Sequence, residues 1–471
     1  MFEFASISFW VFLWVAAAAA IFIFRWKHRD TSVGLVFAYL CNFAILHWVG
    51  AAIYLRSWFG GSDPDATRLG LVESTYAMLA LAFGSLVLAP RVIRRFRIGH
   101  STAMSHAVHR DLPAAFLLLG LTSYLLFSGD LGRLPSMSAV SAVSQQFIVV
   151  GICLLCRGAW ERRDILSVLA YLGAGLLLPF FTIVSQGFLG FGAMACFTIL
   201  CFLSGMIRSQ WRFVAATLVM AMLFLSLYVS YMRDRKEIRQ AVWGGQSMQK
   251  RLGRVYSMVT TLEWFDPFND DHLRRIDSRL NQNYLVGRAV EYLSVSDSYA
   301  NGETIADAAI ALVPRAIWPD KPVRAGSGNL VSRFTGMTFA EGTSVGIGQV
   351  MEWYVNFGRA GILFWFVFVG VLLTVADTMA GIKLRSGDWL SFTMWYVPSL
   401  AVLNIGGSLV EVAGTAGASM VVVTLTNKVF LYRLQRRKKS IPLTESEVRP
   451  VRLASGRRSA GLPRRIARSE S

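Results

Sequence analysis

The sequence contains few charged residues for its length. Asp, Glu, Lys and Arg make up 16% of the 471 residues, whereas soluble proteins carry about 25%. The deficit is uneven, because long uncharged stretches alternate with short clusters of Lys and Arg. A stretch of about 18 or more apolar residues can cross the hydrocarbon core of a bilayer as a helix, and a helix satisfies its own backbone where water is absent. This composition excludes an ordinary soluble domain.

Residues that bind metals or form disulfides are also scarce. All five cysteines fall inside apolar stretches, and the pair Cys153 and Cys156 has no His or acidic neighbour that would complete a metal site. The sequence contains no HxxxH spacing and no visible ATP-binding motif. We therefore expect neither a metal nor a cofactor. The apolar run at the start lacks a preceding basic region, which argues against a cleavable signal peptide.

The formal net charge of +18 lies mainly in connections between the apolar stretches and in the C-terminal tail. This location argues against nucleic-acid binding and fits the excess of Lys and Arg in cytoplasmic loops of membrane proteins. Six basic clusters occupy alternate connections, which predicts an external N-terminus and a cytoplasmic C-terminus. The clusters lie at residues 25–29, 91–97, 157–163, 208–212 and 383–385, and in the tail from residue 433.

The apolar stretches predict an all-α polytopic membrane protein with about eleven transmembrane helices. They divide the chain into residues 1–231 with eight spans, an external loop at 232–357, residues 358–432 with three spans, and a basic tail at 433–471. The tail is rich in Arg, Ser and Pro, so we expect a disordered segment attracted to anionic lipids. The spans are expected near residues 7–24, 33–55, 70–89, 113–128, 139–156, 165–184, 190–206, 213–231, 359–380, 390–406 and 414–432.

The long loop differs from the basic connections in being nearly neutral. Residues 232–357 hold 15 Lys and Arg against 14 Asp and Glu. Apolar residues at helical spacing, among them Val255, Met258 and Leu262, predict a helix, and further helices are predicted near 283–294 and 304–313. A loop of this length is usually functional or a small subdomain. We expect its helices to cover the outer mouth of the bundle.

The most distinctive part of this loop is Leu312-Val-Pro-Arg-Ala-Ile-Trp-Pro-Asp-Lys-Pro322. Its three prolines restrict the backbone and fix the relation between the cations beside them. Guanidinium groups and exposed backbone amides are typical of phosphate sites. Two interpretations stay open, an anion site or an interfacial loop whose arginines meet lipid phosphates or pair with Asp320 and Glu341. The cations concerned are Arg315, Lys321, Arg324 and Arg333.

The segment Pro314-Arg-Ala-Ile-Trp-Pro-Asp-Lys-Pro322 resembles the signature of bacterial O-antigen and exopolysaccharide repeat-unit polymerases. The later Tyr354-Val-Asn-Phe-Gly-Arg-Ala-Gly361 is similar too, and the likeness extends to one long external loop before the last three spans. One position departs from the family pattern. The turn at 184–192, between the sixth and seventh spans, carries Gln186 where the family often has an arginine. Another cation must replace it, either Arg133 or an arginine of the long loop.

The resemblance implies a GT-C-type polymerase and ligase architecture in the bacterial cytoplasmic (inner) membrane. Such metal-independent glycosyltransferases join polyprenyl-diphosphate-linked oligosaccharides at the outer face of that membrane. A sugar hydroxyl attacks the anomeric carbon of the growing chain, and polyprenyl diphosphate leaves. Cations must stabilise the leaving group, and a general base must accept the hydroxyl proton. The implied partners are the lipid-linked oligosaccharide, membrane lipids, a chain-length regulator and a flippase.

Four residues are candidates for the general base. We rank Glu341 first, His272 second and Glu352 third, and Glu411 joins them because its Gly-rich hairpin faces the same side as the long loop. Each also has a structural interpretation: an ion pair for Glu341, a surface position for His272 and an interfacial anchor for Glu352. Asp377 lies near the cytoplasmic end of the ninth span and is expected to be a boundary residue.

Two other functions are weighed against a polymerase. An O-antigen ligase shares the plan and the donor but passes the glycan to a lipid acceptor, and the proline-rich segment favours the polymerase. A transporter or flippase for lipid-linked sugars would be expected to show an inverted repeat with matching broken helices, and neither is visible.

Overall fold

The computed structural model describes residues 6–96, 111–127, 137–207, 209–313, 318, 320–321, 326–339 and 345–440. Within these ranges the regular elements are all helical, and no strand occurs. Residues 1–427 form one compact unit, and residues 428–471 form a second, of which 441–471 lie outside the described part. The tail that was predicted to be disordered from residue 433 onward is therefore described only as far as residue 440. The chain is an all-α protein whose long apolar helices are those of a membrane protein.

Eight helical segments among the described residues are long and apolar enough to cross a membrane. They comprise α1 (Ile7–Lys27); α2 (Leu35–Phe43) with the π-helical turn η3 (Ala44–Trp48) and α3 (Val49–Ala52); α4 (Pro64–Phe83) with η5 (Gly84–Leu88) and α5 (Ala89–Arg95); α7 (Met137–Glu161); α8 (Ile165–Leu176) with α9 (Leu178–Gln186); α11 (Gln210–Trp243); α17 (Gln349–Arg385); and α19 (Leu409–Ser440). The other three expected spans coincide with shorter helices, α6 (Leu112–Phe127), α10 (Gly190–Phe202) and α18 (Trp389–Val402). The number eleven therefore stays a prediction.

The C-terminal ends of α1, α7 and α17 meet in space, which tests the alternation of the helices. Arg29, Arg157 and Arg385, one from each end, line a common crevice. If these three C-terminal ends lie at one face of the membrane, the chain must cross the membrane an odd number of times between α1 and α7. The same holds between α7 and α17. Counting α6 and α10 as crossings satisfies both conditions, so this meeting supports the alternation on which the predicted topology rests.

A buried carboxylate ties the same end together. Asp377 of α17 forms an ion pair with Arg25 of α1 and accepts hydrogen bonds from the Ser32 hydroxyl at 2.6 Å and the Leu35 backbone amide at 2.9 Å. It therefore satisfies the start of α2 while neutralising Arg25. This arrangement agrees with a boundary residue and gives Asp377 a structural role.

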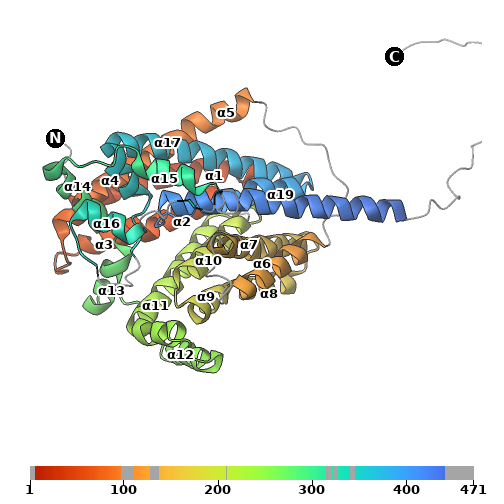
Figure 1. Cartoon of the computed structure of the whole chain (residues 1–471), viewed down its shortest axis with the longest axis horizontal. Coiled ribbons are helices and arrows are strands. Elements are labelled where there is room, and N and C mark those ends of the chain that lie inside the picture. The colour runs from red at the N-terminus through yellow and green to blue at the C-terminus, as the bar shows by residue number, and fades with distance from the viewer. Residues whose placement is uncertain are drawn as a thin grey trace, which may run out of the picture. The chain divides into compact units, whose positions relative to one another are not determined.

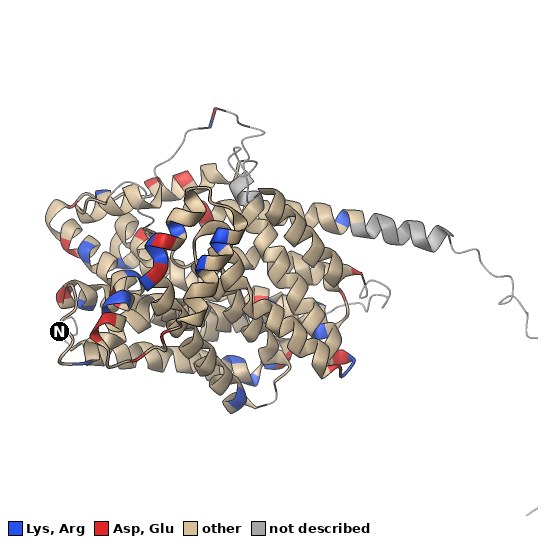
Figure 2. Ribbon diagram, turned by 90° about the horizontal axis from the view of Figure 1, so that it is seen from below, with Lys and Arg blue, Asp and Glu red and all other residues tan. Residues whose placement is uncertain are grey.

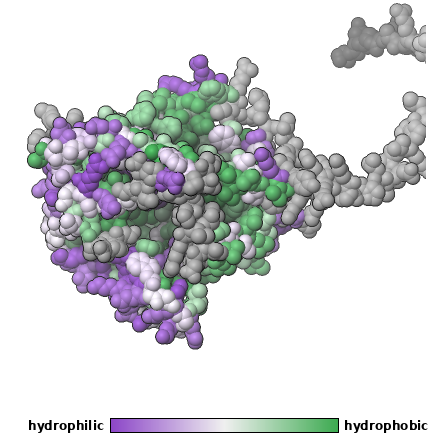
Figure 3. All heavy atoms as spheres, in the orientation of Figure 1, coloured by the Kyte–Doolittle hydropathy of each residue, from purple (hydrophilic) through white to green (hydrophobic). Residues whose placement is uncertain are grey.

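Polar and apolar surfaces are separated along the bundle. Figure 2 shows the charged residues gathered on a few segments of the ribbon, with long stretches of uncharged helix between them. In Figure 3 the hydrophilic surface lies over α12 (Met248–Thr260) and α14 (Gln282–Ser296), whereas hydrophobic surface covers much of the helices beside them. Large apolar side chains such as Phe12, Leu166 and Phe364 are more than half exposed, as expected where lipid replaces water.

The described residues of the long loop between α11 and α17 form five helices, which Figure 1 shows in green and teal: α12, α13 (Asp270–Leu280), α14, α15 (Glu303–Ala311) and α16 (Ser327–Thr335). The helices predicted near 283–294 and 304–313 are α14 and α15. Helix α14 packs closely against the first two turns of α4. A Cβ on Gly287 of α14 would lie 1.8 Å from the Ala66 carbonyl oxygen of α4, and one on Gly70 would lie 1.9 Å from that of Asn283. Paired glycines thus let α14 pack backbone to backbone against α4, inside the core.

A break divides α17 near its start. Phe357 and Gly358 have non-helical backbone angles, and Gly358 has φ +57° and ψ −151°, a conformation open essentially only to glycine. Directly after the break, Arg359 forms a two-point ion pair with the buried Glu73 of α4, with a shortest distance of 2.6 Å. The residues before it, including Glu352, therefore form a short helix separate in direction from the long span.

Candidate functional site: an arginine-rimmed apolar cavity

A cavity of about 270 Å³ opens between α11, α13, η3 and the turn that joins α9 to α10. Most of its wall is apolar, and its polar groups are one amide, two tyrosines and three arginines. No acidic side chain from the described part of the chain lines it. The lining consists of Asn42, Ile45, Leu46, Phe188, Leu189, Gly190, Ala193, Met194, Phe224, Tyr228, Tyr231, Met232, Arg235, Arg239, Arg279 and Leu280.

The three arginines gather at one part of this wall. Arg235 and Arg239 are one helical turn apart on α11, and Arg279 lies in the last turn of α13. Burial, together with the positive charge of Arg235, holds the pKa of Arg279 below its usual range. Among the described residues, Arg235 and Arg239 form no ion pair with a carboxylate. The cluster therefore carries positive charge that an anionic ligand would neutralise.

Arg239 of α11 also reaches the turn at residues 184–192. Its guanidinium lies 4.6 Å from the ring centre of Phe188 and 4.9 Å from that of Trp243. The turn is held against α11 by the Tyr231 hydroxyl, which donates to the Gly187 carbonyl at 2.7 Å. Of the two replacements predicted for the arginine that this turn lacks, Arg133 lies outside the described residues and Arg239 belongs to the stretch predicted as the long loop, so the replacement stays a prediction.

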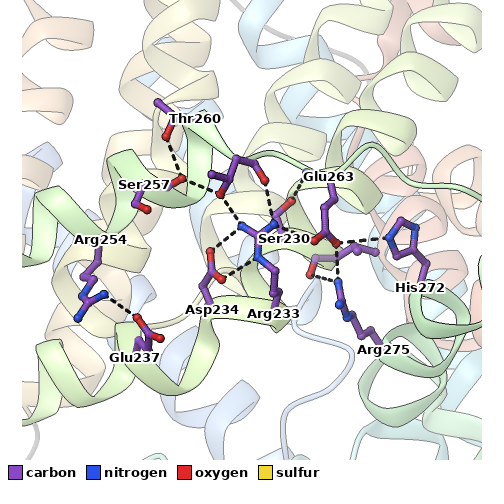
Figure 4. A network of polar contacts seen from close by, with 12 residues as sticks. Ser230, Arg233, Asp234, Glu237, Arg254, Ser257, Thr260, Glu263, His272 and Arg275 are labelled. Atoms are coloured by element: carbon purple, nitrogen blue, oxygen red, sulfur yellow. Dashed lines mark hydrogen bonds and ion pairs between the residues drawn. The ribbon is translucent and has the colours of Figure 1, made fainter.

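A network of ion pairs fixes α11 against α13 beside the cavity (Figure 4). Glu263, between α12 and α13, accepts hydrogen bonds from Arg233 at 2.8 Å and from Arg275 at 2.7 Å, and its backbone amide donates to the Ser230 hydroxyl. Burial opposes ionisation of Glu263, but these two arginines outweigh it and hold its pKa below the ordinary value. The network sets the spacing between the helices that carry the cavity arginines.

His272 belongs to this network and does not line the cavity. The Asp266 backbone amide donates to its Nδ1 at 3.1 Å, so the neutral ring carries its proton on Nε2, which lies 3.4 Å from a carboxylate oxygen of Glu263. The side chain is buried, so the solvated surface position considered from the sequence is wrong. Both ring nitrogens are engaged, which indicates a structural role for His272.

Glu352 and Glu411 lie together at the hairpin between α18 and α19. Glu352 is fully buried, and its Oε2 accepts a hydrogen bond from the Leu409 amide at 2.6 Å, while Oε1 makes no hydrogen bond with any described residue. Glu411 is exposed and follows two residues after Leu409. The other side of the hairpin reaches the cavity wall, because a Cβ on Gly406 would lie 3.4 Å from Leu46. One residue of the hairpin thus contacts the cavity wall, and neither acid lines the cavity.

The predicted cations of the proline-rich segment are only partly described. Arg315, Arg324 and Glu341 lie outside the described residues. Lys321 donates to the carbonyl oxygens of Ala311 at 3.2 Å and Val313 at 3.0 Å, at the C-terminal end of α15. Arg333 pairs with Glu303 at 2.9 Å. Neither lines the cavity.

The cavity arginines were missed in the sequence. Arg235 and Arg239 continue an apolar span with a spacing of four residues, a signal for cations on one face of a helix that outlasts its membrane segment. Arg279 carries no such local signal, because only the fold brings α13 beside α11. No group of three metal-binding side chains occurs in the part of the chain that the structure describes.

Comparison with known proteins yields a family without an assigned activity. No curated protein and no solved structure shows significant similarity to the chain. The model of one family matches residues 35–384, which include α2 to α17 and thus the cavity and the ion-pair network. The chain therefore belongs to the family described as "Domain of unknown function (DUF8712)".

Proposed function

We propose that the protein is a membrane glycosyltransferase that polymerises polyprenyl-diphosphate-linked oligosaccharide units at the outer face of the bacterial cytoplasmic membrane. The observation that carries this proposal is the cavity, which combines an apolar wall with three arginines and no acid. A ligand that fits must have an anionic head and an apolar tail. A prenyl diphosphate has both, and arginine binds phosphate oxygens through paired N–H donors.

In this reaction the diphosphate leaves from the anomeric carbon of the growing chain. Arg235, Arg239 and Arg279 hold its oxygens and stabilise the charge that develops on them as the bond breaks. The isoprenoid chain lies along the apolar wall formed by α10 and α11. The proline-rich segment with Arg315 and Arg324 supports the same activity through its family resemblance.

The attacking sugar hydroxyl must lose its proton as the new glycosidic bond forms. Glu411 is the proton acceptor in this proposal, because it is exposed on the hairpin that borders the cavity wall. Glu352 is a positioning residue, since its carboxylate holds the hairpin through the Leu409 amide. His272 is assigned no chemical role, because both of its nitrogens are engaged in the network.

Reconstitution tests the proposal. The full chain is placed in liposomes with lipid-linked oligosaccharide extracted from source cells that lack this gene, and the products are separated by gel electrophoresis. A ladder of polymers is expected from the wild type and a loss of the ladder from the double variant R235Q/R239Q. A product that forms only when a lipid acceptor is added would identify a ligase, and no glycan transfer with either acceptor would overturn the proposal.

A further inference from the structure

A second cationic crevice lies where the C-terminal ends of α1, α7 and α17 meet. Its volume is about 60 Å³. About 10–15 Å³ holds one water molecule, so the crevice has room for a group of several heavy atoms. Arginines from three separate segments enter it: Arg29 after α1, Arg157 in α7 and Arg385 at the end of α17.

The arginines retain donors for a ligand. Arg157 uses its Nε for Glu161 at 2.6 Å, Arg385 uses one terminal nitrogen for Asp30 at 3.3 Å, and Arg29 lies over the Trp26 ring at 5.2 Å. A guanidinium has five N–H donors in a planar fork, so these contacts leave most of them unused. Among the described residues, Asp30 is the only acidic one that lines the crevice, and it is 73% exposed. The crevice therefore carries an excess of positive charge.

The rest of the crevice lies at the ends of membrane-spanning helices. Ser32, Val33, Phe202, Met206 and Leu384 line it beside the arginines, and all five are buried, so the accessible wall is mostly polar. The nearby Arg25 is already neutralised by the buried Asp377. Membrane-spanning helices end at the level of the lipid headgroups, where phospholipid phosphates are the most abundant anions.

We propose that this crevice binds the phosphate of an anionic phospholipid and that the bound lipid joins the ends of α1, α7 and α17. Basic pockets between membrane helices are known to hold such headgroups. The site is separate from the arginine-rimmed cavity, and the proposal does not depend on the proposed enzymatic activity. Its chemistry is the same at whichever membrane face these helix ends lie.

Thermal unfolding in lipid nanodiscs tests this inference. The full chain is compared in phosphatidylcholine alone, in phosphatidylcholine with increasing phosphatidylglycerol, and in phosphatidylcholine with inorganic phosphate in solution. The variant R29Q/R385Q keeps a polar side chain at both positions but removes two charges. The matched control R91Q/R94Q removes two exposed charges of α5, which do not line the crevice.

Phosphatidylglycerol should raise the unfolding temperature of the wild type in a saturable manner, and R29Q/R385Q should need at least about tenfold more of it for the same shift. The control variant should behave like the wild type. If phosphatidylglycerol raised the unfolding temperatures of R29Q/R385Q and of the control variant equally, the crevice would not be the binding site. A shift of equal size from inorganic phosphate would show that a free anion suffices and would overturn the assignment to a lipid.

Discussion

Arg239 shows how one side chain combines a structural and a binding role. Its guanidinium lies beside two adjoining aromatic rings, those of Phe188 and Trp243, which limit its rotamers before any ligand arrives. An arginine held in this way loses less side-chain entropy on binding than a free one. The same stacking restrains the turn after α9, so ligand binding and turn conformation are linked at this residue.

Replacement of Arg239 by Gln should weaken binding of undecaprenyl diphosphate. A hydrogen bond to a charged group contributes about 1.5–3 kcal/mol, which corresponds to a loss of roughly tenfold to a hundredfold in affinity. Microscale binding measurements in detergent check this. The matched control is R254Q, since Arg254 lies on α12, pairs with Glu237 and does not line the cavity. If R239Q and R254Q bound undecaprenyl diphosphate with equal affinity, Arg239 would not be part of the binding site.

Replacement of Glu411 by Gln should slow glycan transfer by about 10²–10⁴-fold, the usual contribution of a general base. Binding of undecaprenyl diphosphate should stay as in the wild type, because the acid does not line the cavity. Rates of polymer formation in liposomes and the binding measurement separate the two effects. The control E237Q changes an exposed acid of α11 that pairs with Arg254; a rate of E411Q no lower than that of E237Q would contradict the assignment.

At the scale of single helices, the close packing of α4 and α14 depends on glycine. Each helix presents a glycine to a backbone carbonyl of the other, Gly70 to Asn283 and Gly287 to Ala66. Small residues at such crossings permit the van der Waals contact that holds helices together in lipid. The buried pair formed by His47 and Asn283, with Nδ1 and Oδ1 2.8 Å apart, adds a polar contact from η3 to the same crossing.

The substitution Gly287→Ala should therefore destabilise the protein by at least about 1–3 kcal/mol, the range for overpacking, because the obstacle is backbone. Thermal unfolding in detergent measures the effect. Gly253→Ala in α12 is the matched control, since nothing lies within 4 Å of a Cβ built there. A helical glycine costs about 0.5–1 kcal/mol relative to alanine, so the control should be slightly stabilised. Similar unfolding temperatures for the two variants would contradict the crossing.

The network around Glu263 should make the contact between α11 and α13 sensitive to acid. Its folded-state pKa lies below the unfolded value of about 4.3, so folding favours the carboxylate form. The resulting stability is complete above that value and is lost as the pH falls through the lower folded-state pKa. Unfolding temperatures measured from pH 7 to pH 3 should drop less steeply for E263Q than for the wild type. Parallel curves would show that Glu263 contributes nothing to the acid response.

The whole bundle was predicted from sequence more completely than the site. Uncharged stretches revealed where the helices lie, because lipid exposure imposes apolarity along an entire span. Because the spans are uniformly apolar, the sequence does not indicate which helices are neighbours. The position of Arg279 beside α11 could therefore not be predicted. Glycines such as Gly287 are common in the chain, and their partners appear only in three dimensions. The most specific string, Pro314 to Pro322, lies largely outside the described residues, so its cations stay predictions.

The predicted orientation of the molecule can be tested directly. In a cysteine-free background, Gly253→Cys on α12 should react with a membrane-impermeant maleimide added to intact cells, since the long loop is expected outside. Ser386→Cys, beside the end of α17, should react only after the membrane is opened. Mass-shift labelling on gels reads both. Reaction of residue 386 from outside would reverse the proposed topology.

The seating of α14 against α4 has a consequence for biogenesis. The first spans leave the ribosome and reach the bilayer long before residue 287 has been made. Until that segment has been made, α4 lacks this neighbour. The contact between α4 and α14 therefore forms only after the first helices have been synthesised, and a chain truncated before α14 would leave Ala66 and Gly70 of α4 without it.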